Sequence, residues 1–315
     1  MFTTQTTADT TAAQRTVRTT DGIALAVSEY GNPAGALTVV FLHGHCLRSE
    51  SWSFVRDELI SRYAGARILC FDHRGHGDSA VAAAATYTIE QLANDLHDVL
   101  DEVAGPIVLI GHSMGGMTAL TYAALYPHEI GTRIVGFGLI ATAASGLAEA
   151  GFGRFLRNPA VSMFQAGVRR APELMQSAKR LACKVFAPVV RAAEFGDRTV
   201  SPRVLTLAYA MHNETPIVTM ASFLSSFMTY DRSAVLSSLS AIPTLVLCGS
   251  ADLMTPPSHS VAMAAGIEYA DFVMIDGAGH SVIMEQPAEV AEAVTRLLDR
   301  AAGTPSIVDE LVLVA

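Results

Sequence analysis

Short apolar runs rich in Val, Ile, Leu and Phe recur along the first half of the chain, and they constrain its fold more than any other feature. They occupy residues 23–30, 37–43, 66–72, 106–112 and 134–143. The last four are almost continuously apolar, which is typical of strands buried on both faces. Segments of helical periodicity lie between them, at 50–62, 88–103 and 115–126. This alternation predicts right-handed crossovers and a mostly parallel, doubly wound α/β sheet.

The alternation stops near residue 145 and returns after Pro243. Between these points the chain contains Phe-, Met-, Arg- and Ala-rich stretches interrupted by five prolines, as short helices broken by proline would. Strand-like runs then reappear at 244–250 and 271–276, with helical segments near 256–265 and 286–301. The middle of the chain is therefore predicted to be a helical insertion into one sheet domain.

These pattern changes set the expected domain boundaries. We expect residues 17–144 and 236–302 to form the core and residues 145–235 to form a helical cap. The chain ends are expected to be a flexible N-terminal tail, residues 1–16, and a C-terminal tail, residues 303–315.

Composition excludes several classes of protein. Hydrophobic residues make up 50% of the 315 residues against 16% charged, which favours a folded chain with a large core. The net charge of −9, with no basic cluster interleaved with aromatics, argues against a nucleic-acid partner. Apolar stretches run for under about ten residues, short of the roughly 20 that span a bilayer, so no integral membrane segment is expected.

The N-terminus and the cysteines indicate the compartment. The first twenty residues are polar and Thr-rich, without the apolar core of a secretory signal. The four cysteines have no paired spacing, and we interpret them as buried thiols in a reducing compartment: Cys46, Cys70, Cys183 and Cys248. A cytoplasmic location is therefore expected.

The pentapeptide GHSMG, residues 111–115, directly follows the apolar run PIVLI and precedes a helical segment. A G-x-S-x-G sequence between a strand and a helix holds its serine on a sharp turn with the hydroxyl exposed. Bulky side chains in place of Gly111 and Gly115 would collide with adjoining segments. Ser113 is therefore predicted to be a nucleophile, the alternative being an ordinary buried turn serine.

A serine hydroxyl needs a general base at neutral pH. Among the ten histidines, His280 stands in the glycine-flanked loop GAGHSVIMEQP, between the last predicted strand and the last predicted helix. This loop lies at the carboxyl end of its strand, and therefore on the same edge of the sheet as Ser113. His280 is the predicted base, and the alternative is a surface-loop histidine.

The base needs a carboxylate that fixes its tautomer and stabilises the imidazolium. Asp252 follows the strand at 244–250, in the sequence GSADLMTP. The end of the preceding strand, residues 140–146, contains no Asp or Glu. Asp276 lies four residues before His280 and is better placed to close that loop. Asp252 is therefore the predicted orienting acid.

An oxyanion hole would complete this site, because backbone N–H groups stabilise the charge that develops on a carbonyl oxygen. The N–H of Met114 follows from the turn at the serine. A second donor is expected from the loop HGHC, residues 43–46, where His45 follows the His-Gly pair.

Four histidines, His45 among them, have spacings that could suggest a zinc site: His43, His45, His73 and His76. The sequence singles out no further ligand, so we predict no metal site and interpret these residues as structural. Asp72 and Arg74, in the same sequence region, are interpreted as residues that brace loops, and the alternative is a chemical role.

In this order, the motifs resemble those of the α/β-hydrolase-fold superfamily, in its lidded serine esterase or lipase-like group. The matching sequences are HGHC, DHRGHGDS (72–79), GHSMG, GSADLMTP and GAGHSVIMEQP. The resemblance implies an α/β-hydrolase fold with an inserted helical cap. It also implies Ser113 as nucleophile, Asp252 as acid, His280 as base, and oxyanion amides at His45 and Met114. No cofactor is implied.

The activity expected from this resemblance is hydrolysis of a carboxylic ester or thioester through an acyl-enzyme at Ser113. An apolar cap favours a hydrophobic acyl or small aromatic substrate. The family also includes carbon–carbon bond hydrolases, perhydrolases and cofactor-free oxygenases with similar residues, so these reactions stay open. A non-enzymatic ligand receptor is a further alternative, and the sequence leaves the oligomeric state open.

Overall fold

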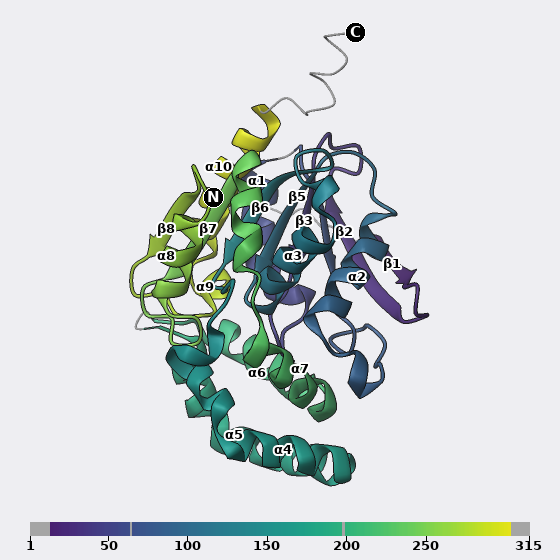
Figure 1. The fold of residues 1–315 in the computed structure, drawn as a ribbon, viewed down its shortest axis with the longest axis vertical. Helices are drawn as coiled ribbons and strands as arrows, with labels where there is room; N and C mark the ends of the chain where they lie inside the picture. The colour runs from purple at the N-terminus through teal and green to yellow at the C-terminus, as the bar shows by residue number, and fades with distance from the viewer. Residues whose placement is uncertain (1–12, 64, 197–198, 304–315) are drawn as a thin grey trace, which may run out of the picture.

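The computed structural model describes residues 13–63, 65–196 and 199–303, with the side chains of residues 183–186 outside that description. In the described residues a single sheet has the strand order β1-β2-β4-β3-β5-β6-β7-β8 (Figure 1). Its strands are β1 (Ala13–Arg18), β2 (Ala24–Gly31), β3 (Thr38–Leu42), β4 (Arg67–Phe71), β5 (Ile107–His112), β6 (Ile134–Ile140), β7 (Thr244–Gly249) and β8 (Asp271–Ile275). The seven predicted strands correspond to β2 through β8.

In the described residues the sheet is parallel from β4 through β8, and its antiparallel pairs are β1 with β2 and β2 with β4. Strand β3 lies in its middle, with Val39 opposite Ile68 of β4 and Val108 of β5. All five residues of β3 are buried, because successive side chains point to opposite faces and both faces are covered. The predicted mostly parallel, doubly wound sheet is confirmed.

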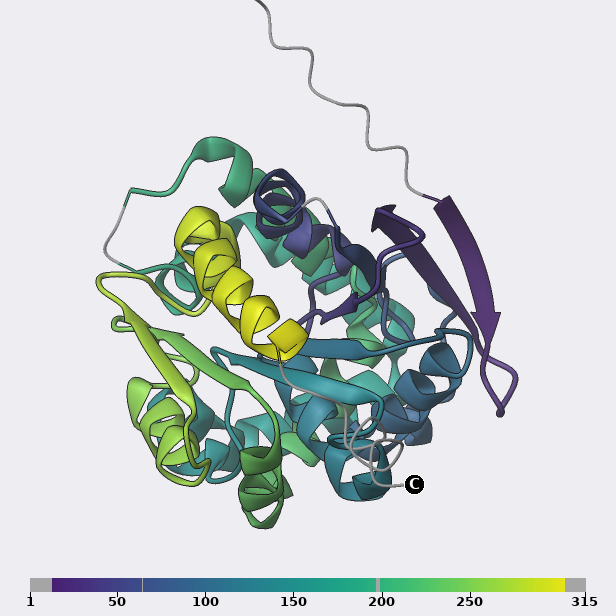
Figure 2. The same cartoon turned by 90° about the horizontal axis from the view of Figure 1, so that it is seen from above.

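Helices cover both faces of the sheet (Figure 2). The described α-helices are α1 (Ser53–Arg62), α2 (Ile89–Leu100), α3 (Met114–Leu125), α4 (Pro159–Arg170), α5 (Pro172–Glu194), α6 (Pro202–Glu214), α7 (Ile217–Thr229), α8 (Pro257–Ala265), α9 (Val282–Glu285) and α10 (Pro287–Gly303). Helices α1 and α10 share one apolar core with the sheet, and α2, α3 and α8 share the other. Each core therefore lies between one layer of helices and one face of the sheet.

The expected N-terminal tail is wrong in its last four residues. Strand β1 begins at Ala13 and pairs with β2 from Ala13 opposite Glu29 to Arg18 opposite Ala24. Its sequence is polar because it is an edge strand, and only Val17 is fully buried. At the other end, helix α10 includes Gly303, which was expected in the C-terminal tail. Residues 1–12 and 304–315, where the rest of both expected tails falls, lie outside the described residues.

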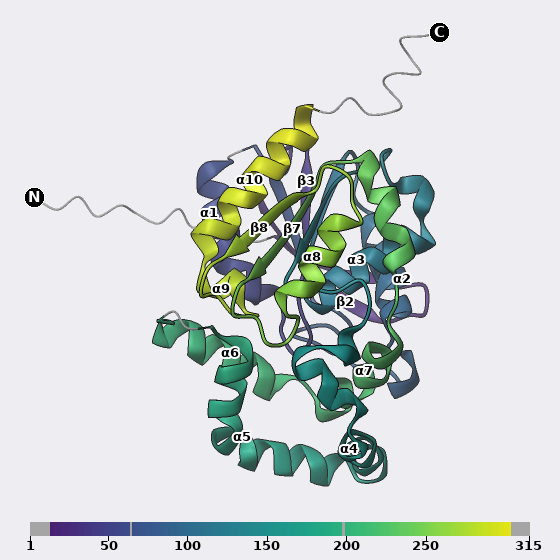
Figure 3. The ribbon, with the colours of Figure 1, turned by 60° about the vertical axis from the view of Figure 1, so that its left-hand side comes forward.

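The chain between β6 and β7 contains α4 to α7, and we call residues 141–243 the β6–β7 helical segment. It lies at one end of the sheet, with α4 and α5 farthest from the core (Figures 1 and 3). Helix α5 contains Pro188 and bends near its middle, as expected where proline removes a helical hydrogen bond (Figure 3).

Candidate active site

Ser113 connects the last residue of β5 to the first residue of α3. Its φ of 53° and ψ of −119° lie outside the regions that side-chain-bearing residues ordinarily adopt, so the backbone is strained at this residue. A Cβ on Gly111 would lie 2.4 Å from the Gly115 backbone, and one on Gly115 would lie 2.3 Å from the Leu42 carbonyl oxygen. The turn is therefore possible only because both positions are glycine.

Ser113, His280 and Asp252 form a continuous chain of hydrogen bonds. The Ser113 Oγ lies 2.9 Å from His280 Nε2, and His280 Nδ1 lies 2.9 Å from Asp252 Oδ2. The three residues follow the carboxyl ends of β5, β8 and β7, which meet at one edge of the parallel part of the sheet. His280 and Asp252 are buried, whereas Ser113 is partly exposed. The structure thus brings together the three side chains that the sequence singled out.

The loop after β7 fixes the Asp252 carboxylate. Its Oδ1 accepts hydrogen bonds from the N–H groups of Met254 and Thr255, at 2.8 and 2.9 Å. Its Oδ2 accepts a 2.8 Å bond from the Thr255 hydroxyl as well as contacting His280. The carboxylate is held by bonds to both oxygens, so it can orient the imidazole without rotating.

The electrostatics of the site favour a charged imidazole at His280. Burial disfavours the imidazolium, but the Asp252 carboxylate 2.9 Å away outweighs burial, with smaller contributions from Glu194 and Glu285. Together they raise the pKa of His280 to about 9. The arrangement therefore stabilises the protonated base that proton transfer from a serine would create.

Both predicted backbone donors lie beside Ser113. Met114 is the first residue of α3, so its N–H has no carbonyl partner within the helix. The loop that holds His45 packs against the serine, since a Cβ on Gly44 would lie 3.2 Å from the Ser113 Cβ. The loop that holds His45 and the first turn of α3 therefore both adjoin Ser113.

Helix α7 brings aromatic side chains to this edge of the sheet. The His45 ring lies 5.8 Å from the Phe223 ring and 5.2 Å from the Phe227 ring, measured between centroids. Both phenylalanines belong to a buried apolar cluster that includes Met114 and Met117 of α3. The sequence could not tell which residues of the insertion lie near the site; these contacts identify Phe223 and Phe227 as two that pack against the His45 ring.

Glu194 is a site residue that the sequence analysis missed. It is buried at the end of α5, where its backbone oxygen accepts a 2.7 Å bond from the Ser281 N–H and its Oε2 accepts a 2.7 Å bond from the Ser281 hydroxyl. Its Oε1 lies 3.5 Å from His212 Nε2 of α6. Burial opposes charge on both groups, but their attraction outweighs it, lowering the pKa of Glu194 and raising that of His212.

Glu285 of α9 makes a second link between the end of α5 and the loop that carries His280. Its two oxygens accept bonds from the N–H of Gly196, at 3.0 Å, and the N–H of Gly279, at 2.9 Å. The two glycine backbones are so close that a Cβ on Gly279 would lie 2.3 Å from the Gly196 nitrogen. Glu194 belongs to no recognisable motif, so no signal in the sequence alone could have found it, whereas Glu285 stands in the matching sequence GAGHSVIMEQP.

The side chains of the loop after β4 that the sequence analysis singled out make structural contacts. Arg74 is fully buried and contacts Asp95, with bonds of 2.5 and 2.6 Å, and Asp21, with two bonds of 3.0 Å. Asp72 accepts bonds from the N–H groups of Ser49 and Asp78. Burial lowers the pKa of His43 and of His76 to about 3, so both are neutral at pH 7. In the described part of the chain, no group of three or more His, Cys, Asp and Glu side chains is arranged to hold a metal ion.

A sequence model described as "Alpha/beta hydrolase family" matches residues 39–293 of the chain. Among curated proteins, the chain is 27% identical to the mouse sn-1-specific diacylglycerol lipase ABHD11 over 265 residues, which cover 82% of this chain and 80% of the relative. It is 28% identical to the proline iminopeptidase PfmaB of Pestalotiopsis fici over 247 residues, which cover 74% of this chain and 82% of the relative.

Among solved structures, the chain is similar to a thermophilic esterase from Thermogutta terrifontis. The TM-score is 0.72 and the sequence identity 28%, and the match covers 92% of this chain and 99% of the esterase.

Proposed function

The chain belongs to the α/β-hydrolase family and is a hydrolase, and from this premise we propose that it cleaves a carboxylic ester or thioester through an acyl-enzyme at Ser113. The observation that carries the proposal is the hydrogen-bonded chain from Ser113 through His280 to Asp252. The lipase and esterase activities named for the mouse and Thermogutta terrifontis proteins support an ester substrate.

In the proposed first half-reaction, the Ser113 Oγ attacks the substrate carbonyl carbon and its proton passes to His280 Nε2, 2.9 Å away. Asp252 stabilises the resulting imidazolium and keeps Nδ1 protonated. The N–H groups of Met114 and His45 receive the negative charge that forms on the carbonyl oxygen. As the tetrahedral intermediate collapses, the carbon–oxygen or carbon–sulfur bond breaks and His280 protonates the departing alcohol or thiol.

In the second half-reaction a water molecule takes the place of the departed alcohol. His280, neutral again, removes a proton from the water as its oxygen attacks the acyl carbon. The bond to Ser113 Oγ then breaks, and the proton returns to the serine. The products are the carboxylic acid and the free enzyme.

We assign residues 145–235 the role of a cap over this site. The assignment is supported by helix α7, whose Phe223 and Phe227 contact the His45 ring. An apolar wall of this kind favours a hydrophobic acyl chain or a small aromatic group over a charged substrate. A cytoplasmic location fits the three described cysteines, Cys46, Cys70 and Cys248, which are all buried and free; the side chain of Cys183 lies outside the described residues.

The test is hydrolysis of p-nitrophenyl esters of increasing acyl-chain length by the purified wild type, by Ser113→Ala and by Ser177→Ala. Ser177 is exposed on α5 and serves as the matched control. We expect turnover that is lost in Ser113→Ala, kept in Ser177→Ala and greatest for one range of chain lengths. Failure to turn over any ester, with Ser113 still reactive toward an acylating probe, would instead favour carbon–carbon bond hydrolysis, perhydrolysis, cofactor-free oxygenation or ligand reception.

A further inference from the structure

Basic residues are concentrated in one part of this acidic chain. Residues 151–191 contain eight of its 21 Lys and Arg but only one of its 30 Asp and Glu. This stretch comprises α4, most of α5 and the short 3-10 helix Gly151–Arg157 that precedes them. A strongly positive region within a chain of net charge −9 therefore lies on the helices farthest from the core (Figures 1 and 3).

Helices α4 and α5 pack against α7 through apolar side chains. Phe164, Val168 and Met175 form a small apolar cluster with Ile217 and Ala221 of α7. This cluster accounts for the apolar residues on the inner side of the two helices. It leaves their outer side without a covering element among the described residues.

Large apolar side chains are nevertheless exposed on α4, on α5 and on the 3-10 helix that precedes them. The side chains concerned are Phe155, 60% exposed, Met163, 74%, Leu174, 70%, Leu181, 84%, and Val189, 57%. Leu174 and Leu181 are seven residues apart, so they lie on the same side of α5 two turns from each other. Exposed large apolar residues are ordinary when scattered, but a group on one surface indicates a contact with a partner.

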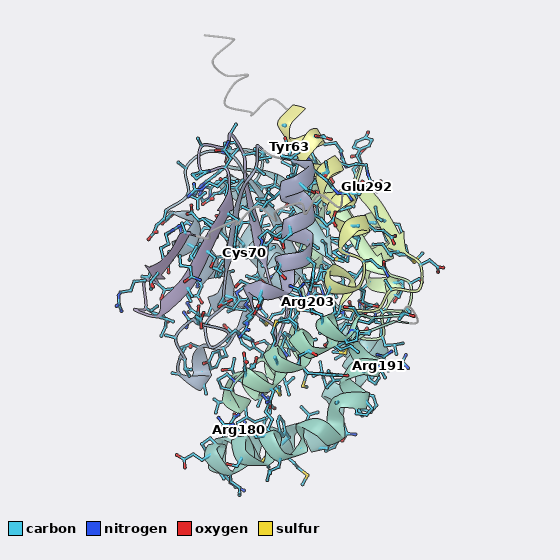
Figure 4. The ribbon with its side chains drawn as sticks, turned by 180° about the vertical axis from the view of Figure 1, so that it is seen from behind. Tyr63, Cys70, Arg180, Arg191, Arg203 and Glu292 are labelled. Atoms are coloured by element: carbon cyan, nitrogen blue, oxygen red, sulfur yellow. The ribbon has the colours of Figure 1, made fainter. Side chains whose placement is uncertain are left out.

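Exposed arginines accompany the apolar residues. Arg169 and Arg170 end α4, and Arg180 and Arg191 lie along α5 (Figure 4). Arg180 adjoins Leu181 on the first part of α5, whereas Arg191 lies beyond Pro188, after the bend in the helix (Figure 3). We call the five exposed apolar residues and these four arginines the distal face.

We propose that the distal face docks onto the surface of an anionic lipid bilayer. Apolar side chains next to arginines are the combination that enters the headgroup region of such a bilayer, where leucines reach the acyl chains and guanidinium groups contact phosphates. Negative lipid charge attracts the basic helices and selects this end of the otherwise acidic molecule for contact. Docking is peripheral, and none of the described helices has the length and apolar character needed to cross a bilayer.

Docking in this orientation places α7, which lies between the distal face and the site, on the membrane side of the core. The inference goes beyond the proposed function, because it depends on the outer side of the cap and not on the chemistry at Ser113. Its test is therefore a binding measurement on the full-length chain.

The experiment is flotation of the protein with vesicles of pure phosphatidylcholine and with vesicles that also contain phosphatidylserine. Three variants are compared with the wild type: Leu174→Ser with Leu181→Ser; Arg169→Gln with Arg170→Gln and Arg191→Gln; and the control Met274→Ser with Arg296→Gln. The control residues are an exposed methionine of β8 and an exposed arginine of α10, so both lie on the surface of the sheet domain and not on the distal face. Thermal unfolding of each variant verifies that it folds.

We expect the wild type and the control to float with phosphatidylserine vesicles, to be released by high salt and to bind phosphatidylcholine poorly. Each distal-face variant should partition onto phosphatidylserine vesicles about tenfold or more weakly than the wild type. The leucine variant buries less apolar area in the bilayer, and the arginine variant pairs fewer charges with lipid phosphates. Ser113→Ala should bind as the wild type does, whether or not the protein is an esterase. Absence of binding by the folded wild type would overturn the proposal, as would equal binding by all variants. A dimer in sedimentation that Leu174→Ser with Leu181→Ser abolishes would assign the face to a second copy instead.

Discussion

Glu194, the last residue of α5, accepts a 2.7 Å hydrogen bond from the hydroxyl of Ser281, the residue that follows His280. The β6–β7 helical segment is thereby joined to the loop that carries the proposed base. Glu285 repeats the link through Gly196 and Gly279. The end of α5 therefore helps to position His280.

The Glu194 link gives a first prediction. Glu194→Gln keeps an oxygen that can accept the Ser281 bond but removes the negative charge that faces His212 and contributes to the raised pKa of His280. The pKa of His280 should fall, shifting the rise of kcat/KM to lower pH, and the free energy of unfolding should drop by about 1–3 kcal/mol because His212 loses its partner. Glu173→Gln, at the exposed start of the same helix, should change neither quantity. An unshifted pH profile in Glu194→Gln would leave Glu194 with a purely structural role.

The pH dependence of the wild type follows from the pKa of His280. The base must be neutral to accept the serine proton, and its pKa is raised to about 9. The logarithm of kcat/KM should therefore rise with pH with a slope of about 1 and level off above the pKa. Asp252→Asn should move this rise to lower pH, because the largest stabilising charge is gone, and lower kcat by about 10⁴. A profile that is flat from pH 6 to pH 9 would contradict the assignment of His280.

Gly111 and Gly115, the glycines on either side of the Ser113 turn, give a prediction for stability that is separate from the chemistry. A Cβ on Gly115 would lie 2.3 Å from the carbonyl oxygen of Leu42 in the central strand β3, where the backbone has no room to move. Gly115→Ala should therefore lower the free energy of unfolding by about 3 kcal/mol or more, by the overpacking of a close-packed core. Gly65→Ala, where nothing lies within 4 Å, should be neutral. Chemical denaturation measures both free energies of unfolding, and a Gly115→Ala variant as stable as the wild type would contradict the tight packing of Gly115 against Leu42.

Arg74 gives a prediction for the loop after β4. Its guanidinium group is fully buried against Asp95 and also pairs with Asp21. Arg74→Met would leave Asp95 buried without its partner, which costs about 3–5 kcal/mol of unfolding free energy. Arg62→Met removes an exposed arginine that pairs with Glu58 on α1 and should cost less than about 1 kcal/mol. Thermal unfolding distinguishes them, and similar values for the two variants would show that Arg74 is not a structural brace.

Much of this architecture could be predicted from the sequence, because buried parallel strands and their loops leave strong signals. The apolar runs located β2 through β8, and the residues after β5, β7 and β8 placed Ser113, Asp252 and His280 at one sheet edge. Strand β1 was missed because an edge strand pairs through its backbone and needs few apolar residues. Its sequence therefore resembles that of a polar tail.

Contacts between distant segments could not be predicted in the same way. Glu194 and Ser281 are 87 residues apart, and a lone buried glutamate at a helix end has no periodicity or motif to mark it. The same holds for Phe223 and Phe227, because helical spacing shows that a face is apolar but not which neighbour it meets. The contacts of these residues depend on how the β6–β7 helical segment packs against the core, and only the structure shows that packing.

The most direct test of the central claim, that Ser113 is the nucleophile, is covalent labelling with a fluorophosphonate followed by intact-mass measurement and peptide mapping. We expect one adduct per wild-type chain on the peptide containing Ser113, none on Ser113→Ala and slower labelling of His280→Gln. A labelled Ser113→Ala, or a wild type whose adduct maps to another residue, would contradict the assignment of Ser113.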